Sequence, residues 1–364
     1  MIRSTTFDPP EYAGWKAEPE LVQQYLRTIS QDSNRKALIE ALDRDPLLEL
    51  YRRLVRARLI DQVLAGWVRQ GVIAEAWLAT GEEACTTGPL FALDPKADYI
   101  LPVIRNHSAN ADFGLPLVDL FRSYLGSTDG PSRGRDAHPG SVTHHVIPPI
   151  GSPGAMVPVC LGLALAAKIQ NRASVALTWI GDGATKSGPT HEGLNMAAVQ
   201  RVPAVFIIQH HQVALGAGPE QHHWPADFSD WPEAYGMAGG SFDGNHVLDA
   251  WAATALAVQR CRRGEGPVML VTNTFRMGGR STDDERQCRD TITAESFSAW
   301  GKRDPIGMYE EYLRGRGVPA GELSRVEAVV RDEVDQAAES AGAGNRDGVP
   351  ESALSGVYAR ESIG

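Results

Sequence analysis

The chain has 364 residues, of which 43% are hydrophobic and 22% are charged, a composition that is ordinary for a globular protein. This length allows one large α/β domain with extensions or two domains of average size. The net charge of −10 argues against general nucleic-acid binding, which needs a basic face, but it leaves room for a local basic pocket.

The cysteines and the apolar stretches point to an ordinary intracellular enzyme. None of the four cysteines forms a CxxC pair, so we expect reduced thiols in a cytoplasmic protein. The longest apolar stretch, around 157–167, is too short to cross a bilayer, and the N-terminal sequence shows no apolar core of a secretory signal. We therefore expect neither a membrane nor nucleic acid as a partner.

In chain order, polarity and helical periodicity divide the sequence into three parts. Residues 1–45 are polar and carry Pro9-Pro10, so we expect an N-terminal arm and one helix. Residues 46–341 are expected to form one α/β domain, and the glycine-rich, polar residues 342–364 a C-terminal tail. Within the domain, the spacing of apolar residues predicts seven helices. One starts near Gly81, and the other six span Leu47–Val68, 115–126, Ala155–Ile169, Thr190–Gln200, Pro305–Arg314 and Ala320–Ala341.

Three runs rich in β-branched residues, Ser174–Ile180, Ala204–Gln209 and Val268–Thr272, predict strands. A glycine turn and a helix separate the first two, which is the βαβ pattern of a doubly wound parallel sheet with helices on both faces. The irregular stretch 127–153 is long for a compact domain, and such loops are usually functional.

The first two predicted strands end in residues that suit a phosphorylated ligand. Asp182 follows one strand and His211 the other, and parallel strands place their carboxyl ends at one edge of the sheet, where ligands bind. Gly181 and Gly183 allow close approach of a ligand, and the amides of Gly183 and Ala184 suit a diphosphate bridged by a cation. The alternative is a plain turn with Asp182 as a cap, because glycine-aspartate turns are common.

The whole segment from Gly181 to His211 resembles the thiamine-diphosphate motif, and most closely that of the α subunits of pyruvate and branched-chain 2-oxo acid dehydrogenases. The resemblance runs from about Leu47 to the chain end. It includes Arg69-Gln70-Gly71, the sequence GEEA from Gly81, Gly134-Arg135 with His138, Gly151-Ser152-Pro153, Thr274-Phe275-Arg276 with Ser281-Thr282, and the terminal SGVYARES.

The resemblance implies a function, cofactors and partners. The function is oxidative decarboxylation of a branched-chain or pyruvate-like 2-oxo acid, with thiamine diphosphate and Mg²⁺ as cofactors. A β subunit would supply the activating glutamate within a heterotetramer, and a lipoyl acyltransferase would accept the acyl group. The implied metal ligands are Asp182, His211 and the carbonyl of Val213; the implied cofactor contacts are Arg105, Ser152, Gly181, Asp182, Gly183, Ala184 and His211; the implied catalytic residues are His138, Arg280 and Ser281.

Three positions depart from the family pattern. His211 replaces the metal-binding asparagine, Ile104 replaces a tyrosine, and Arg280 replaces the histidine that serves acyl transfer. Imidazole suits Zn, Mn, Fe or Ni better than Mg²⁺, unless His211 donates directly to the diphosphate. Arginine stays protonated, so Arg280 cannot act as a general base, although it can bind an anion. These departures leave open a thiamine-dependent carboligase subunit or a non-catalytic homologue with a degenerate metal site.

Two other clusters receive structural interpretations. A zinc site of His210, His211, His222 and His223 is disfavoured, because neighbouring residues on a strand point to opposite faces. Glu82-Glu83 is interpreted as a carboxylate pair at a helix N-terminus.

Overall fold

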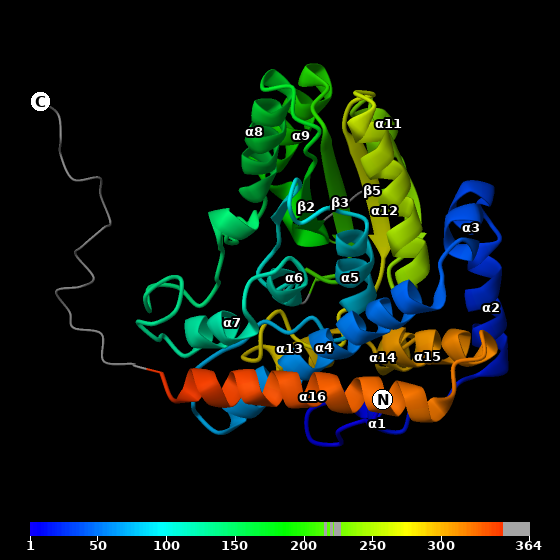
Figure 1. The fold of residues 1–364 in the computed structure, drawn as a ribbon, viewed down its shortest axis with the longest axis vertical. Coiled ribbons are helices and arrows are strands. Elements are labelled where there is room, and N and C mark those ends of the chain that lie inside the picture. The colour runs from blue at the N-terminus through cyan, green and yellow to red at the C-terminus, as the bar shows by residue number, and fades with distance from the viewer. Residues whose placement is uncertain (215–216, 219–220, 222–226, 345–364) are drawn as a thin grey trace, which may run out of the picture.

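A five-stranded parallel sheet in the order β1-β2-β3-β5-β4 forms the centre of the molecule (Figure 1). The computed structural model describes residues 1–214, 217–218, 221 and 227–344. The strands are β1 (Tyr99–Leu101), β2 (Ala176–Gly181), β3 (Ala204–His210), β4 (Ala238–Asp243) and β5 (Val268–Asn273).

The three predicted strands are neighbours in this sheet, which confirms the α/β fold. Gly181 pairs with Gln209, and His210 pairs with Asn273, so β2, β3 and β5 end at the same level. Their β-branched side chains are buried on both faces of the sheet, as is usual for parallel strands. The residues that follow these three strands are thereby brought to one edge.

The two outer strands were not predicted from the sequence. β1 has only three residues, and β4 reads Ala-Gly-Gly-Ser-Phe-Asp, with no apolar run. Gly239 allows β4 to lie against Pro232, since a Cβ at this position would come within 2.5 Å of the proline ring. Pairing with β2 and β5, rather than local sequence preference, therefore defines the two edges.

Helices cover both faces of the sheet, so the doubly wound architecture is confirmed. α5 (Glu83–Phe91) and α12 (Val247–Arg262) pack with the apolar residues of one face. α8 (Met156–Ile169) and α9 (Gly188–Gln200) cover the other face, where α11 (Trp231–Ala234) also packs. The turn between β2 and α9 is the short 3₁₀ helix η2 (Asp182–Lys186), with which the site begins.

A helical layer lies beside the sheet, along the lower part of the view in Figure 1. It contains α4 (Arg44–Arg69), α7 (Leu117–Tyr124), α15 (Pro305–Gly315) and α16 (Ala320–Gly342). Leu323, Val330, Val334 and Ala341 recur on one face of α16, which packs on α4 and α7. The remaining elements are α1 (Pro10–Ala13), α2 (Pro19–Ile29), α3 (Ser33–Glu40), α6 (Ser108–Asp112), η1 (Val142–His144), α13 (Glu285–Thr291) and α14 (Ala294–Gly301).

The predicted helices are confirmed, with ends that differ by a few residues from those expected. The prediction of a single helix in residues 1–45 was wrong, because this part contains α1, α2 and α3. Proline at the first turn of α1 and α2 and the Asp32 cap of α3 explain where these short helices begin. The domain boundaries remain predictions.

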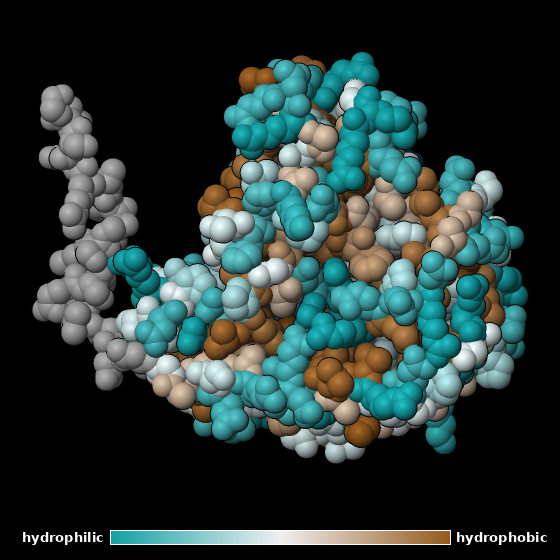
Figure 2. All heavy atoms as spheres, viewed as in Figure 1, coloured by the Kyte–Doolittle hydropathy of each residue, from teal (hydrophilic) through white to brown (hydrophobic). Residues whose placement is uncertain are grey.

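Hydrophilic residues predominate on the face shown in Figure 2, and hydrophobic residues are scattered among them. In the described part of the chain, no helix is both long and apolar enough to cross a membrane. All four cysteines are free and buried.

Candidate functional site

The carboxyl ends of β2 and β3 open into a cavity of about 360 Å³. Segments far apart in the sequence form its wall, including the residues after both strands and the loop that follows β5. The cavity brings together most of the residues selected from the sequence: Arg105, Ser152, Gly181, Asp182, Gly183, Ala184, His211, Val213 and Arg280.

Asp182 is the buried anion of this site, and a histidine flanks each of its carboxylate oxygens. Nδ1 of His211 lies 3.4 Å from Oδ1, and Nδ1 of His210 lies 3.4 Å from Oδ2. The amide of Gly183 donates to Oδ1 at 2.8 Å. Burial would raise the pKa of Asp182, but the two histidines and this amide outweigh it and hold the pKa below the usual value. Asp182 is therefore ionised at neutral pH.

His211 is neutral at the same pH. Burial lowers the pKa of His211 to about 3, although the charge of Asp182 acts in the opposite direction. A neutral imidazole has a nitrogen lone pair that is available to a metal ion or a hydrogen-bond donor.

Close packing requires one of the two glycines of the GDG sequence. A Cβ on Gly183 would lie 2.9 Å from the Cβ of Ala214, so the segment after β3 can approach the turn after β2 because this side chain is missing. A Cβ on Gly181 would lie 3.3 Å from Nε2 of His211, a tight contact that a small shift of the imidazole relieves. Between His211 and Val213 the backbone turns through Gln212, whose φ of +71° lies in the left-handed region.

Arg105 joins this edge to two other segments. Its guanidinium donates to the carbonyls of Leu78 at 3.0 Å and Arg280 at 3.1 Å, and it lies 3.5 Å from Oε2 of Glu82. Burial lowers the pKa of Arg105, although Glu82 partly compensates. Burial likewise raises the pKa of Glu82, and Arg105 and Arg276 oppose this shift. These contacts fix the guanidinium of Arg105 in the wall of the cavity.

Two residues near the cavity were not selected as site residues from the sequence. Arg276 lines the cavity and is 2% exposed; its Nε donates to the carbonyl of Gly278, and its Nη2 has no hydrogen-bond partner. Glu82 accepts a hydrogen bond from Gln209 and pairs with Arg105, so its role differs from that of a helix-end carboxylate. The position of Arg276 just after β5 was the signal that could have identified it.

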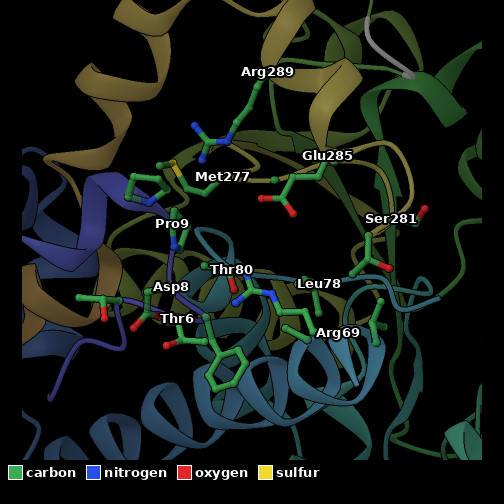
Figure 3. A pocket seen from close by; sticks show the side chains of 18 residues that line it. Thr6, Asp8, Pro9, Arg69, Leu78, Thr80, Met277, Ser281, Glu285 and Arg289 are labelled. Carbon is green, nitrogen blue, oxygen red and sulfur yellow. The ribbon is translucent and has the colours of Figure 1, made fainter. Parts of the chain in front are cut away.

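The three residues expected to be catalytic do not all line this cavity. Arg280 lines it, is 41% exposed at its side chain, and lies 3.7 Å from Glu75. His138 contacts Asp136 at 3.0 Å, packs against Trp77 and is not among the residues that line the cavity. Ser281 lines a second cavity of about 300 Å³, formed with the N-terminal arm and with Arg69 and Arg289 (Figure 3).

The polar groups at this edge of the sheet fit an anionic ligand that itself supplies some of the atoms that coordinate a bound cation. Among the described residues, no group of three His, Cys, Asp or Glu side chains could hold a metal ion. His222 and His223 lie outside these residues. Buried polar atoms without a partner each cost about 1–3 kcal/mol, so their concentration at one place indicates a missing ligand. Around the cavity, the atoms without a hydrogen-bond partner among the described residues are Oε2 of Glu82, Oδ2 of Asp182, Nδ1 of His210, Nδ1 of His211 and Nη2 of Arg276.

A parallel α/β sheet with a buried aspartate, two histidines and two arginines at its carboxyl edge defines a protein that binds a phosphorylated ligand. Residues 51–348 match the family model described as dehydrogenase E1 component, and the chain belongs to this family. Proteins of this family use thiamine diphosphate, typically with a divalent metal.

Individual relatives match over most of their length. The chain is 30% identical to the 2-oxoisovalerate dehydrogenase subunit alpha of Bacillus subtilis over 336 residues, which cover 90% of this chain and 99% of the relative. It is 31% identical to the pyruvate dehydrogenase E1 component subunit alpha of the same organism, over 88% of this chain and 84% of the relative. For the corresponding subunit of Zymomonas mobilis the identity is 29%, with 82% and 85% covered.

Proposed function

We propose that this chain is the α subunit of a thiamine-diphosphate-dependent dehydrogenase that decarboxylates a branched-chain or pyruvate-like 2-oxo acid oxidatively. The observation that carries the proposal is the single cavity at the carboxyl edge of the sheet. It joins Asp182, Arg105 and Arg276 within a chain that matches α subunits over most of its length.

The residues around the cavity divide into three roles. Asp182, His211 and the carbonyl of Val213 hold the metal ion. The amides of Gly183 and Ala184, together with Arg105 and Arg276, bind the diphosphate, since arginine forms strong charge-assisted hydrogen bonds to phosphate. Ser152 lies at the aminopyrimidine end. Bound thiamine diphosphate supplies the electron sink that allows the 2-oxo acid to lose CO₂.

The substrate end of the cavity is assigned to Arg280. Its guanidinium is half exposed and keeps its charge, so it can bind the carboxylate of a 2-oxo acid. It cannot exchange protons as a histidine does. His138 and Ser281 keep the catalytic roles that the resemblance implies only if the loops that carry them move, or if a partner completes the site.

The lining of the cavity supports a β subunit as partner. Asp182 is the only carboxylate that lines the cavity in the described part of the chain, and we assign it to the metal. The resemblance implies that the glutamate that activates the aminopyrimidine lies on this second chain. We propose a heterotetramer with this β subunit, which passes the acyl group to a lipoyl acyltransferase.

The test is reconstitution. The α chain alone is expected to give no CO₂ from any 2-oxo acid, and the complex with its β partner is expected to decarboxylate 2-oxoisovalerate or pyruvate. Binding of thiamine diphosphate can be followed by tryptophan fluorescence, because Trp179 lines the cavity. A complex that binds no thiamine diphosphate with any divalent metal contradicts the proposal and supports the non-catalytic homologue.

Arg280 favours a second candidate, a carboligase subunit that forms an acyloin and needs no histidine for acyl transfer. Product analysis separates the two: acyl-lipoamide identifies the dehydrogenase, and an acyloin identifies the carboligase.

A further inference from the structure

The contact of Asp182 with His211 has the separation of two ligands that share one metal ion, and the contact with His210 is equally long. Both distances are 3.4 Å, whereas an N–H···O bond is about 2.7–3.2 Å long. Two atoms that bind one cation at about 2.1 Å, with angles of about 90–109°, lie roughly 3.0–3.4 Å apart. The separation of His211 Nδ1 from Asp182 Oδ1 falls in this range.

Neither imidazole is committed to another partner through this atom. Nδ1 of His210 and Nδ1 of His211 are buried and have no hydrogen-bond partner in the part of the chain that the structure describes. Oδ2 of Asp182 also lacks one within these residues. The ring of Phe228 packs edge-on against His210, with centroids 5.1 Å apart, and so restricts this imidazole. Asp182 is thus confined between two oriented nitrogen atoms.

Nitrogen donors change which cation such a site prefers. Magnesium takes oxygen ligands in a nearly ideal octahedron, while imidazole favours the later first-row divalent ions. Arg105 and Arg276 line the same cavity and can neutralise part of a diphosphate's charge. The cation then has less of the diphosphate's negative charge to neutralise. Its affinity for a nitrogen ligand therefore has more influence on which metal ion binds.

We propose that this chain binds its diphosphate ligand with a transition-metal ion of the Mn²⁺, Co²⁺ or Zn²⁺ class in preference to Mg²⁺. Nδ1 of His211 is the nitrogen ligand, Oδ1 of Asp182 is an oxygen ligand, and His210 holds the other carboxylate oxygen in place. The inference rests on the proposed function, because oxygen atoms of the diphosphate complete the coordination.

The experiment measures the affinity of the α chain with its β partner for thiamine diphosphate, by tryptophan fluorescence, at equal free concentrations of Mg²⁺, Mn²⁺, Co²⁺ and Zn²⁺. Because an imidazole ligand favours later first-row divalent ions over Mg²⁺, we expect binding about tenfold tighter with Mn²⁺ or Co²⁺ than with Mg²⁺. The absorption bands of bound Co²⁺ give a second readout that does not depend on turnover.

The variant His211→Asn replaces the nitrogen ligand by an amide oxygen. It is expected to abolish the preference for Mn²⁺ and Co²⁺ over Mg²⁺ and to shift the Co²⁺ bands. His211→Gln also presents an amide oxygen. It serves as a second variant if the shorter asparagine side chain of His211→Asn prevents folding. The matched control is His191→Asn on α9, where an exposed histidine contacts only Tyr235 and Trp231 among the described residues. This control should leave both readouts unchanged.

Equal affinity with Mg²⁺ and Mn²⁺, or equal affinity in the presence of EDTA, overturns the inference and leaves the proposed function intact. An equal loss of affinity with every metal in His211→Asn also overturns it, because His211 would then contact the diphosphate directly. If no metal supports binding and the complex shows no turnover, the proposed function fails as well.

Discussion

Two buried clusters of charge in this molecule differ in how completely their atoms are paired. In the first, Arg58 of α4 is fully buried, and each of its three guanidinium nitrogens meets a different carboxylate. Nε bonds to Glu83, Nη2 lies 3.1 Å from Asp304, and Nη1 lies 3.5 Å from Asp8. In the second, around Asp182, several buried nitrogen and oxygen atoms have no hydrogen-bond partner among the described residues.

The difference separates structure from function. The Arg58 cluster joins the N-terminal arm, α4, α5 and α15, and its cation is balanced within the chain. The Asp182 cluster stays incomplete until a ligand arrives. Burying a charge without a partner is costly, so a fold retains such a group where something outside the chain completes it. The number of buried atoms that lack a hydrogen-bond partner therefore distinguishes the Asp182 cluster from the Arg58 cluster, where Oδ2 of Asp304 is the one such carboxylate oxygen among the described residues.

Removing the cation of the paired cluster is expected to have the largest effect. Arg58→Met removes the cation that three buried carboxylates share, although Asp304 keeps its ion pair with Arg3, and breaking a buried ion pair in this way costs about 3–5 kcal/mol. Urea unfolding followed by tryptophan fluorescence measures the loss. Arg44→Met is the control, because Arg44 forms an exposed ion pair with Glu322, and its removal should cost less than about 1 kcal/mol. Similar losses in the two variants would contradict the distinction.

Asp182→Asn should affect binding rather than folding. The amide keeps the shape of the side chain but removes the charge that holds the metal, so we expect affinity for thiamine diphosphate to fall on the order of 100-fold, about 2.7 kcal/mol. The free energy of unfolding should change by only about 1 kcal/mol. Titration and urea unfolding of the same preparation separate these effects. A variant that binds normally but unfolds easily would place Asp182 with the structural cluster.

A third buried group, His246, extends the comparison of the two clusters, and the effect expected from its substitution is the smallest of the three. His246 caps α12: Nδ1 accepts from the amide of Asp249 at 3.2 Å, and Nε2 donates to the carbonyl of Tyr25 at 3.1 Å. Both nitrogens are used, whereas Nδ1 of His211 has no hydrogen-bond partner among the described residues. Burial lowers the pKa of His246, although Asp249 and Asp243 oppose this shift.

The sign of the pH dependence follows from that shift. Below an unfolded-state pKa of about 6.5, the unfolded chain binds a proton that the folded chain does not, so this contribution to stability is complete above that pH and is lost as the pH falls. His246→Asn keeps a capping side chain and should show a weaker fall in unfolding midpoint between pH 7.5 and pH 5.5. Parallel pH profiles for the two proteins would rule out this role.

The sequence could predict the sheet centre and most of the cavity because local patterns determine both. β-branched runs define β2, β3 and β5, and residues placed just after strands must meet at the carboxyl edge. Ser281 was expected beside the cofactor but faces the second cavity. The side of an irregular loop to which a residue points depends on contacts with distant segments, such as the bond from the Thr282 amide to the carbonyl of Ala76.

Glu82 and Arg276 illustrate the same limit. Each is adjacent to a recognisable motif, but its importance comes from partners that lie far away in the chain. Glu82 contacts Gln209 across 127 positions, and Arg276 owes its role to a guanidinium atom that lacks a partner. Composition and spacing carry no information on pairing, which only the folded arrangement reveals.

The segment from Arg276 to Thr282 forms a partition between the two cavities. Arg276 and Arg280 line the cavity at the sheet edge, while Met277, Gly278, Gly279, Ser281 and Thr282 line the other. Because one short segment contributes to both walls, a change in its backbone conformation alters both cavities. The N-terminal arm, which lines the second cavity, therefore contacts the same segment that carries the two arginines.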